Sequence, residues 1–390
     1  MSTPAPLARR FHGIEPTIFS AMSALALRTG SVNLGQGFPD TDGPASVLER
    51  ARTAIDEGRN QYAPGIGVPE LREAVARHQA RHHGIDLDPA TEVVVTTGAT
   101  EGIACALLGL VDPGDEVVLL EPAYDSYDAM LQAVGAVRRP VTLRAPDHRL
   151  DVEALRAAVH DGTRLILLNT PHNPTGTVLT PEELAVVAEL AIAHDVLVVT
   201  DEVYEHLVYD GRRHVPIATL PGMAERTLTL SSLGKSWSLT GWKVGWATGP
   251  AALVGAVLAA KQWTTFTSGS PLQPAAAHAL DHESDFPTRL AVDLQRRRDL
   301  LCAGLADAGL TPHVPEGTYF TLTDVAHLGW PDGAAFCAAL PERAGVVAVP
   351  MQGFYADPAT GRHLVRWAFC KDEPVVVDGL RRLAAAELRA

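Results

Sequence analysis

The sequence predicts an α/β fold with a mainly parallel central sheet covered by helices on both faces, followed by a smaller α+β unit. From residue 90 onward, short β-branched runs alternate with helical patterns. The runs are apolar throughout, which is typical of strands that are buried on both faces. After Ala275 this alternation fades, and a long helical pattern leads into shorter, mixed strands.

The expected elements of the larger unit follow in chain order. The first are strand "EVVVTTG", helix "ATEGIACALLGLV" and strand "DEVVLLEP". Next come strand "RLILLNT", helix "PEELAVVAELAIAH", strand "DVLVVTDE", and the runs "RTLTLSS" and "GWKVGWATG". The smaller unit contains helix "QRRRDLLCAGLADAGL" and strands "GTYFTLTD" and "HLVRWAFC". We expect an N-terminal arm at 1–40 that packs with the small domain, a large domain at 41–280 and a small domain at 281–390.

Composition limits the classes of function. The chain has 390 residues, of which 46% are hydrophobic, enough for a large core. Its net charge of -14 argues against a nucleic-acid partner, because phosphates require a basic face. No apolar run reaches the about 18 to 20 residues of a membrane span, and the N-terminus lacks a signal-peptide core. We therefore expect a cytoplasmic protein with neither a membrane nor a nucleic-acid partner.

The run "HQARHHG" is the one place that suggests a metal cluster, through His78, His82 and His83. No acid or cysteine lies nearby in the sequence, and the segment has the pattern of an exposed helix. Ligand number and spacing therefore predict no metal site here.

Polar residues stand at the ends of successive predicted strands. Ligands of open α/β sheets gather beyond the carboxyl ends of the strands, so these residues should converge. They are Gly98, Ala99 and Thr100, then Tyr124, Asn173, Asp201 with Tyr204, and Ser232 with Lys235.

Acidic residues are missing from a long window around "SSLGKSWSLTGWKVGW". No Asp or Glu occurs between Glu225 and Asp281, although the chain has 46 acids and an even spread would place roughly six there. A lysine among neutral residues can lose its proton and attack a carbonyl, which suits Lys235. Lys243, expected on the next strand, could help a helix N-terminus to bind an anion. Buried strands also exclude charge, so both explanations remain open.

A cofactor with both a carbonyl and a phosphate is pyridoxal 5'-phosphate. Its ring nitrogen must stay protonated, which calls for a buried carboxylate such as Asp201. Asn173 and Tyr204 would donate to the ring oxygen, and Tyr124 would stack on the ring. Each residue also has a simpler explanation. Asn173 lies in the turn sequence "NPTG", Tyr204 could be a core tyrosine, and Tyr124 could cap a strand.

Taken together, eight stretches resemble the class I/II pyridoxal-phosphate aminotransferases of fold type I, from about residue 30 to the C-terminus. They are "NLGQGFPD", "NQYAPGIGVPELREAV", "TTGATEGI", "EPAYDSY", "NTPHNPTG", "TDEVYEHL", "SSLGKSWSLTGWKVGW" and "HLVRWAF".

The resemblance implies a role for each site residue. Lys235 would form the covalent imine with the cofactor, Asp201 would pair with the pyridine nitrogen, and Tyr204 would act with them in catalysis. Arg366 would bind the substrate α-carboxylate, assisted by Gly37. The resemblance also implies a homodimer, because Tyr62 would reach the phosphate of the neighbouring subunit. The remaining cofactor ligands would be Ala99, Thr100, Tyr124, Asn173, Ser232 and Lys243, of which Asn173 would also contact the substrate.

One departure concerns Thr100. Many members of the family carry an aromatic residue at the corresponding place, so the ring stacking would fall to Tyr124, and a preference for aromatic substrates is less secure.

Other functions of this fold stay open. Decarboxylases, aldolases, acyltransferases and β-lyases share it, but Arg366 argues for keeping the α-carboxylate. A regulator that uses the fold as a sensor would need a DNA-binding domain, for which the residues before "VNLGQG" are too few.

The substrate expectation comes from the family's subgroups. The runs "AMSALALRTG", "EGTYFTLTD", "LPERAGVVAVPM" and "HLVRWAFCK" resemble N-succinyldiaminopimelate aminotransferases of lysine biosynthesis. Amino transfer to or from 2-oxoglutarate and glutamate is therefore expected. The alternative is a kynurenine, glutamine or methionine aminotransferase, some of which have β-lyase activity.

Overall fold

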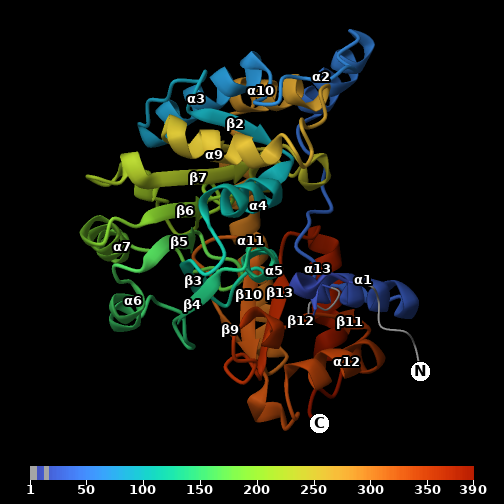
Figure 1. The fold of residues 1–390 in the computed structure, drawn as a ribbon. Helices are drawn as coiled ribbons and strands as arrows, with labels where there is room; N and C mark the ends of the chain where they lie inside the picture. Colours follow the sequence, from blue (N-terminus) through green and yellow to red (C-terminus); the bar gives the residue numbers. More distant parts are fainter. Residues whose placement is uncertain (1–6, 13–16) are drawn as a thin grey trace.

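A seven-stranded sheet, a four-stranded sheet and a two-stranded pair organise the described part of the chain (Figure 1). The computed structural model describes residues 7–12 and 17–390, so part of the predicted arm, 1–6 and 13–16, lies outside the described residues. In the described part, no helix is long and apolar enough to cross a membrane.

The larger sheet has seven strands in the order β2-β8-β7-β6-β5-β3-β4. All its strands run in one direction except β8, which is antiparallel to both neighbours. The prediction of a mainly parallel sheet is confirmed. The strands are β2 (Val93–Thr96), β3 (Glu116–Glu121), β4 (Val137–Thr142), β5 (Thr163–Asn169), β6 (Leu197–Asp201), β7 (Thr227–Ser232) and β8 (Gly245–Thr248).

Helices cover both faces of this sheet, because its strands other than the edge strand β4 are mostly apolar and buried on both sides. In β2, Val94 packs into one core cluster, while Val93 and Val95 pack into another on the opposite face. The first face carries α4 (Gly98–Leu110), α5 (Asp125–Val134) and α9 (Ala251–Lys261). The second carries α2 (Ala45–Asp56), α3 (Pro69–His83), α6 (Val152–Ala158), α7 (Pro181–Ala193) and α10 (Leu272–His282).

The C-terminal part is built on a smaller antiparallel sheet in the order β12-β13-β10-β9. A two-stranded parallel pair, β1 with β11, joins the N-terminal segment to it. Its strands are β1 (Val32–Asn33), β9 (Thr311–His313), β10 (Phe320–Asp324), β11 (Val346–Val347), β12 (Val349–Pro350) and β13 (Leu364–Ala368). Its helices are α1 (Ile18–Thr29), α11 (Phe286–Asp307), α12 (Gly333–Ala344) and α13 (Glu373–Ala384).

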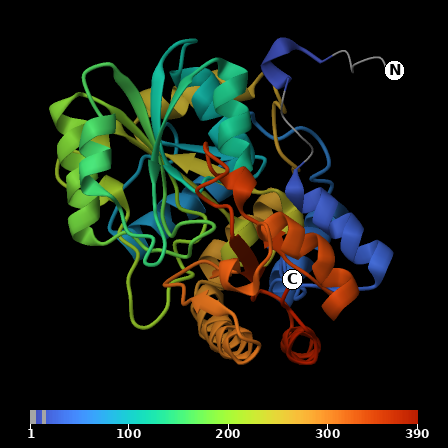
Figure 2. The ribbon, with the colours of Figure 1, turned by 90° about the horizontal axis from the view of Figure 1, so that it is seen from below.

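The N-terminal segment lies against this C-terminal part, as both views show (Figures 1 and 2). Met22 and Ala26 of α1, with Leu34, belong to the same hydrophobic cluster as the buried residues of α11 to α13. Short elements complete the chain: α8 (Leu233–Ser236) and the 3-10 helices η1 (Arg9–Phe11), η2 (Ile217–Thr219), η3 (Ala224–Arg226), η4 (Thr240–Trp242), η5 (Ala326–Leu328) and η6 (Gln352–Phe354).

Two local expectations are wrong. Lys243 does not lie on a strand; it follows η4 and precedes β8, with φ of 52°. The histidine run is not an exposed helix without an acid nearby. His78 is fully buried on α3, and the chain folds Glu205 and His206 against it. The acid was missed because it is more than a hundred residues away in the sequence.

Candidate active site

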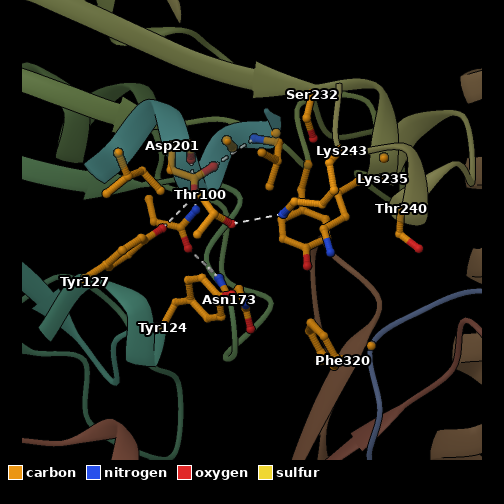
Figure 3. A pocket seen from close by; sticks show the side chains of 18 of the residues that line it. Thr100, Tyr124, Tyr127, Asn173, Asp201, Ser232, Lys235, Thr240, Lys243 and Phe320 are labelled. Carbon is orange, nitrogen blue, oxygen red and sulfur yellow. Dashed lines mark hydrogen bonds between the residues drawn. The ribbon is translucent and has the colours of Figure 1, made fainter. Parts of the chain in front are cut away.

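A cavity of about 260 Å³ lies beyond the carboxyl ends of the parallel strands. Figure 3 shows side chains from several strand ends pointing into it. The structure brings together nearly all of the residues singled out from the sequence. Those that line the cavity are Gly37, Ala99, Thr100, Tyr124, Asn173, Asp201, Tyr204, Ser232, Lys235, Lys243 and Arg366.

Lys235 projects into the cavity from α8, the short helix directly after β7. Burial disfavours its charged form and lowers the pKa of the amine to about 8, although Cys370 and Asp201 act in the opposite direction. Within the described residues, its Nζ forms no hydrogen bond or salt bridge. It lies 5.7 Å and 5.6 Å from the ring centres of Tyr204 and Tyr319. A substantial fraction of Lys235 is therefore a neutral nucleophile near pH 8.

Asp201 is a buried carboxylate at the end of β6. Burial raises its pKa, while hydrogen bonds from Tyr127 and from the Val203 amide, and the charge of Lys235, lower it. The Tyr127 hydroxyl donates to Oδ2 at 2.6 Å, and the Val203 amide donates to Oδ1 at 3.2 Å. The carboxylate is thus held in a fixed orientation and would gain from a cationic partner in the cavity.

Asn173 and Tyr204 occupy the next positions around the cavity. The backbone N–H of Asn173 donates to Asn169 Oδ1 at 2.8 Å, and Asn169 Nδ2 donates to the backbone carbonyl of Asp201 at 2.8 Å. These bonds tie the loop after β5 to the end of β6. Tyr204 is buried, which raises the pKa of its phenol, and its ring lies edge-on to Tyr319 with centres 5.2 Å apart. It remains a neutral donor at physiological pH.

The start of α4 forms an anion cradle. Its first-turn amides have no partners inside the helix and present the positive end of the helix dipole. Gly98 has φ of +71°, which strains any other residue, and a Cβ there would stand 3.1 Å from Lys243 Nζ and press on it. Lys243 Nζ also donates to Thr100 Oγ1 at 3.4 Å. Buried Ser232 closes the cradle from the end of β7.

Arg366 lies fully inside the protein on β13. Burial lowers the pKa of its guanidinium to about 10. Nη2 donates to the Gly35 carbonyl at 3.0 Å and Nη1 to Asn173 Oδ1 at 3.4 Å, while the buried Nε has no partner. Within the described residues it forms no salt bridge, although the charge of Asp125 acts on it from a greater distance. An unpaired buried cation with an open donor is suited to bind an anionic group of a ligand.

Gly37 comes into the site from the N-terminal segment. A Cβ there would stand 2.3 Å from Cζ of Phe320, so a side chain cannot be accommodated without displacing that ring. Its carbonyl accepts a hydrogen bond from the Tyr319 hydroxyl at 2.7 Å. Gly37 thereby joins the N-terminal segment to the C-terminal part at the cavity.

Tyr62 is the one predicted site residue outside the cavity of its own chain. Its side chain is 84% exposed and lies edge-on to Phe266, with ring centres 5.6 Å apart. This position leaves it free to contact another molecule.

Sequence reasoning missed several residues that line the cavity. Tyr127, which holds Asp201, lies within the quoted "EPAYDSY" motif, but its direction could not be inferred from the motif. Phe19 and Phe320 stack on Arg366, with ring centres 4.7 Å and 4.0 Å from its guanidinium carbon. Neither has a polar group to mark it in the sequence. Asn169, Gln36 and Thr240 also line the cavity and were not singled out from the sequence.

Comparison with known proteins identifies the family of this arrangement. The family model "Aminotransferase class I and II" matches residues 29–373. A curated relative, the probable N-succinyldiaminopimelate aminotransferase of Mycobacterium tuberculosis, is 52% identical over 387 residues, covering 96% of this chain and 97% of that protein. The methionine aminotransferase of Escherichia coli is 38% identical, covering 94% and 95%.

Solved structures agree with these relatives. The N-succinyldiaminopimelate aminotransferase structure from Mycobacterium tuberculosis has a TM-score of 0.94 at 51% identity, covering 97% of this chain and 99% of that one. An Escherichia coli structure with a methionine aminotransferase function also has a TM-score of 0.94, at 36% identity, covering 98% and 100%. The fold, the residues around the cavity and these similarities agree, and the chain belongs to the aminotransferase class I and II family, as an enzyme that transfers amino groups.

Proposed function

We propose that the cavity binds pyridoxal 5'-phosphate and that the enzyme uses it to move an amino group between glutamate and N-succinyl-2-amino-6-oxopimelate. The observation that carries the cofactor assignment is that one cavity contains a lysine of lowered pKa, a buried carboxylate and a helix N-terminus with a basic partner. When bound, the cofactor supplies an aldehyde that captures an amine and a ring that accepts electrons.

The residues fit this cofactor in charge and in donor type. Asp201 would keep the ring nitrogen protonated, and Asn173 and Tyr204 would donate to the ring hydroxyl. Tyr124 would cover one face of the ring. The phosphate would be bound by the amides of Ala99 and Thr100 with Ser232 and Lys243.

The chain's own residues would then carry out binding and proton transfer. Arg366 would orient the substrate through its α-carboxylate, since its guanidinium can make a two-point contact. Lys235 Nζ would take up and return the proton at the reacting carbon, which its lowered pKa favours near neutral pH. Phe19, Phe320 and Tyr204 would exclude water around these groups.

Similarity supports the choice of substrate: the probable N-succinyldiaminopimelate aminotransferase of Mycobacterium tuberculosis is 52% identical over 96% of this chain. The remote end of N-succinyl-2-amino-6-oxopimelate carries further carboxylates, and an unpaired buried carboxylate costs several kcal/mol. Among the described lining residues, the cations are Lys235, Lys243 and Arg366, each already assigned. We infer that the remote carboxylates extend beyond this cavity wall, toward the second subunit.

A second candidate is transfer from methionine or kynurenine. The rings of Phe19 and Phe320 beside Arg366 would suit an apolar side chain, and relatives with these activities are 37% to 38% identical.

A panel of amino donors with 2-oxoglutarate separates the two candidates. N-Succinyl-diaminopimelate should exceed kynurenine, glutamine and methionine in kcat/KM. If kynurenine, glutamine or methionine wins by more than about tenfold, equal to about 1.4 kcal/mol, the succinylated substrate is excluded.

We also propose a homodimer in which Tyr62 reaches the partner's phosphate cradle. Tyr62 and Trp263 are 84% and 83% exposed, and Phe266, three residues after Trp263 and in contact with Tyr62, is 46% exposed. The segment that follows Trp263 contacts the start of α4, since Thr97 Oγ1 donates to Thr265 Oγ1 at 3.5 Å. An exposed aromatic patch next to the cradle suits a subunit interface. Light scattering should find a dimer at catalytic concentration, and a fully active monomer would exclude this arrangement.

We also propose how the chain is divided into domains. The joint core of α1, Leu34 and the C-terminal helices supports a division into an arm at 1–40, a large domain at 41–280 and a small domain at 281–390. A cytoplasmic location and the lack of a nucleic-acid partner stay predictions from composition.

A further inference from the structure

A second group of titratable side chains lies on the second face of the large sheet, away from the cavity. His78 and His82 are one helical turn apart on α3, and His83 ends that helix. Glu205 and His206, in the segment that follows β6, pack against them. None of these side chains has a role in the amino transfer described above.

Their geometry suits a metal ion. His78, Glu205 and His206 each offer a ligand atom, and these atoms lie within 4.8 Å of one another. Nε2 of His78 is 2.8 Å from Nε2 of His206. Around tetrahedral zinc, with bonds of about 2.0 to 2.1 Å, two nitrogens lie about 3.3 Å apart. If the two nitrogens moved about half an ångström further apart, both could therefore bind one ion.

His82 lies close enough to be a fourth ligand. The ring centre of His82 is 4.7 Å from that of His78 and 4.9 Å from that of His206. His82 is partly exposed and lines a cavity of about 570 Å³, together with His83 and His214. An ion could therefore approach the cluster from the side of His82.

The ligand types also suit a metal. Two imidazoles and a carboxylate meet here, and both kinds of side chain bind zinc in proteins.

The hydrogen bonds without an ion leave His78 incompletely satisfied. Only one proton can lie between the facing Nε2 atoms of His78 and His206, and Nδ1 of His78 is buried without a partner. Buried polar atoms without partners are uncommon. Glu205 is held at 2.6 Å by His83 Nε2 and at 2.5 Å by the Ser231 hydroxyl.

We propose that His78, Glu205 and His206, with His82 as the fourth ligand, form a binding site for a divalent transition-metal ion such as Zn²⁺. A site rich in imidazole favours zinc, nickel, copper or cobalt over magnesium or calcium. The ion would link α3 to the segment that carries Tyr204, because Glu205 is the next residue. Glu205 also contacts Ser231, the neighbour of Ser232. The ion would thus stabilise the positions of the segments that carry Tyr204 and Ser232, on the side away from the cavity.

The test uses tag-free holoenzyme that has been dialysed against a chelator. Titration with Zn²⁺ by calorimetry should show one ion bound per chain, and saturation should raise the thermal midpoint. Co²⁺ should produce the visible bands of a tetrahedral nitrogen and oxygen site. No stoichiometric binding of either ion to the wild-type enzyme overturns the proposal.

Variants locate the ion. His206→Gln should weaken Zn²⁺ more than about 100-fold, since changes outside the ligand shell alone cost about 10- to 100-fold. His82→Gln, at a partly exposed position, should weaken it as well and guards against misfolding of the first variant. The matched control is His278→Gln with His282→Gln, a pair four residues apart on α10 whose ring centres are also 4.7 Å apart. Binding that survives in His82→Gln and His206→Gln, or disappears in the control, overturns the assignment.

Discussion

At the scale of single residues, burial decides the chemistry of Lys235. Its amine has a pKa of about 8 instead of 10.5, because the charged form is poorly solvated in the cavity. Below pH 8 it is mostly protonated and cannot attack a carbonyl; above pH 8 it is mostly neutral. In cofactor-free enzyme, the rate of pyridoxal phosphate capture should therefore rise with pH through a midpoint near 8. Stopped-flow absorbance measures this rate. A midpoint near 10 would show that Lys235 is a solvated lysine, and Lys235→Ala, the control, should capture nothing.

Arg366 is expected to act on the substrate and not on the cofactor. Arg366→Lys keeps the charge but replaces a planar fork by a point charge. Losing one charged hydrogen bond of about 1.5 to 3 kcal/mol should lower kcat/KM for amino acids by about 10- to 100-fold. The dissociation constant of pyridoxal phosphate, measured by fluorescence titration, should stay within about twofold. Unchanged turnover would make Arg366 a structural residue.

Tyr127 is expected to hold Asp201 in its ionised form. Tyr127→Phe removes the donor at 2.6 Å from Oδ2, so the pKa of Asp201 should rise and its ionised form, which would keep the ring nitrogen protonated, should be less stable. The expected loss in kcat is about 10-fold or more, corresponding to a hydrogen bond to a charged group. Steady-state kinetics measures it, and circular dichroism checks the fold. Full activity in Tyr127→Phe would exclude this role.

At the scale of elements, the sequence predicts most strands of the large sheet but not the direction in which each strand runs. Strands such as β5 and β6 are apolar on both faces, so they stand out between helices. The reversed direction of β8 leaves no mark in its composition, because parallel and antiparallel strands buried on both sides contain the same residues. The contact of His78 with Glu205 was also not predictable, because it depends on how α3 packs over the sheet and not on the residues near His78 in the sequence.

The junction of β8 with α4 offers a test at this scale. A Cβ on Gly245 would stand 2.7 Å from the carbonyl carbon of Gly98 and 2.8 Å from the Ala99 nitrogen. Gly245→Ala should push the start of α4 away from β8 and weaken pyridoxal phosphate binding, by about tenfold or more if 1.4 kcal/mol of cradle contacts is lost.

Gly255→Ala on α9 is the matched control, because a Cβ there meets nothing within 4 Å. It should leave cofactor affinity unchanged, as measured by equilibrium dialysis. Equal affinity in both variants would mean that the start of α4 does not bind the phosphate.

At the scale of the whole molecule, the cavity lies where the N-terminal segment, the large sheet and the C-terminal part meet. Gly37, Lys235 and Arg366 come from these three parts and line one cavity. Strand ends predicted that residues such as Asp201 and Lys235 would gather, and the family resemblance added Gly37 and Arg366. They did not predict which groups would meet the remote end of the substrate, because a second subunit would supply them. Tyr62 is exposed in the single chain, and the residues that it would contact belong to that second subunit.

Amino transfer requires the enzyme to keep the amino group between two half-reactions. The most direct measurement uses cofactor-loaded enzyme and ¹⁵N-glutamate without an oxo acid acceptor. Each chain should retain about one equivalent of ¹⁵N while 2-oxoglutarate is released, and should pass the label to N-succinyl-2-amino-6-oxopimelate when that acceptor is added. Release of carbon dioxide, or failure to retain ¹⁵N, would contradict amino transfer at Lys235.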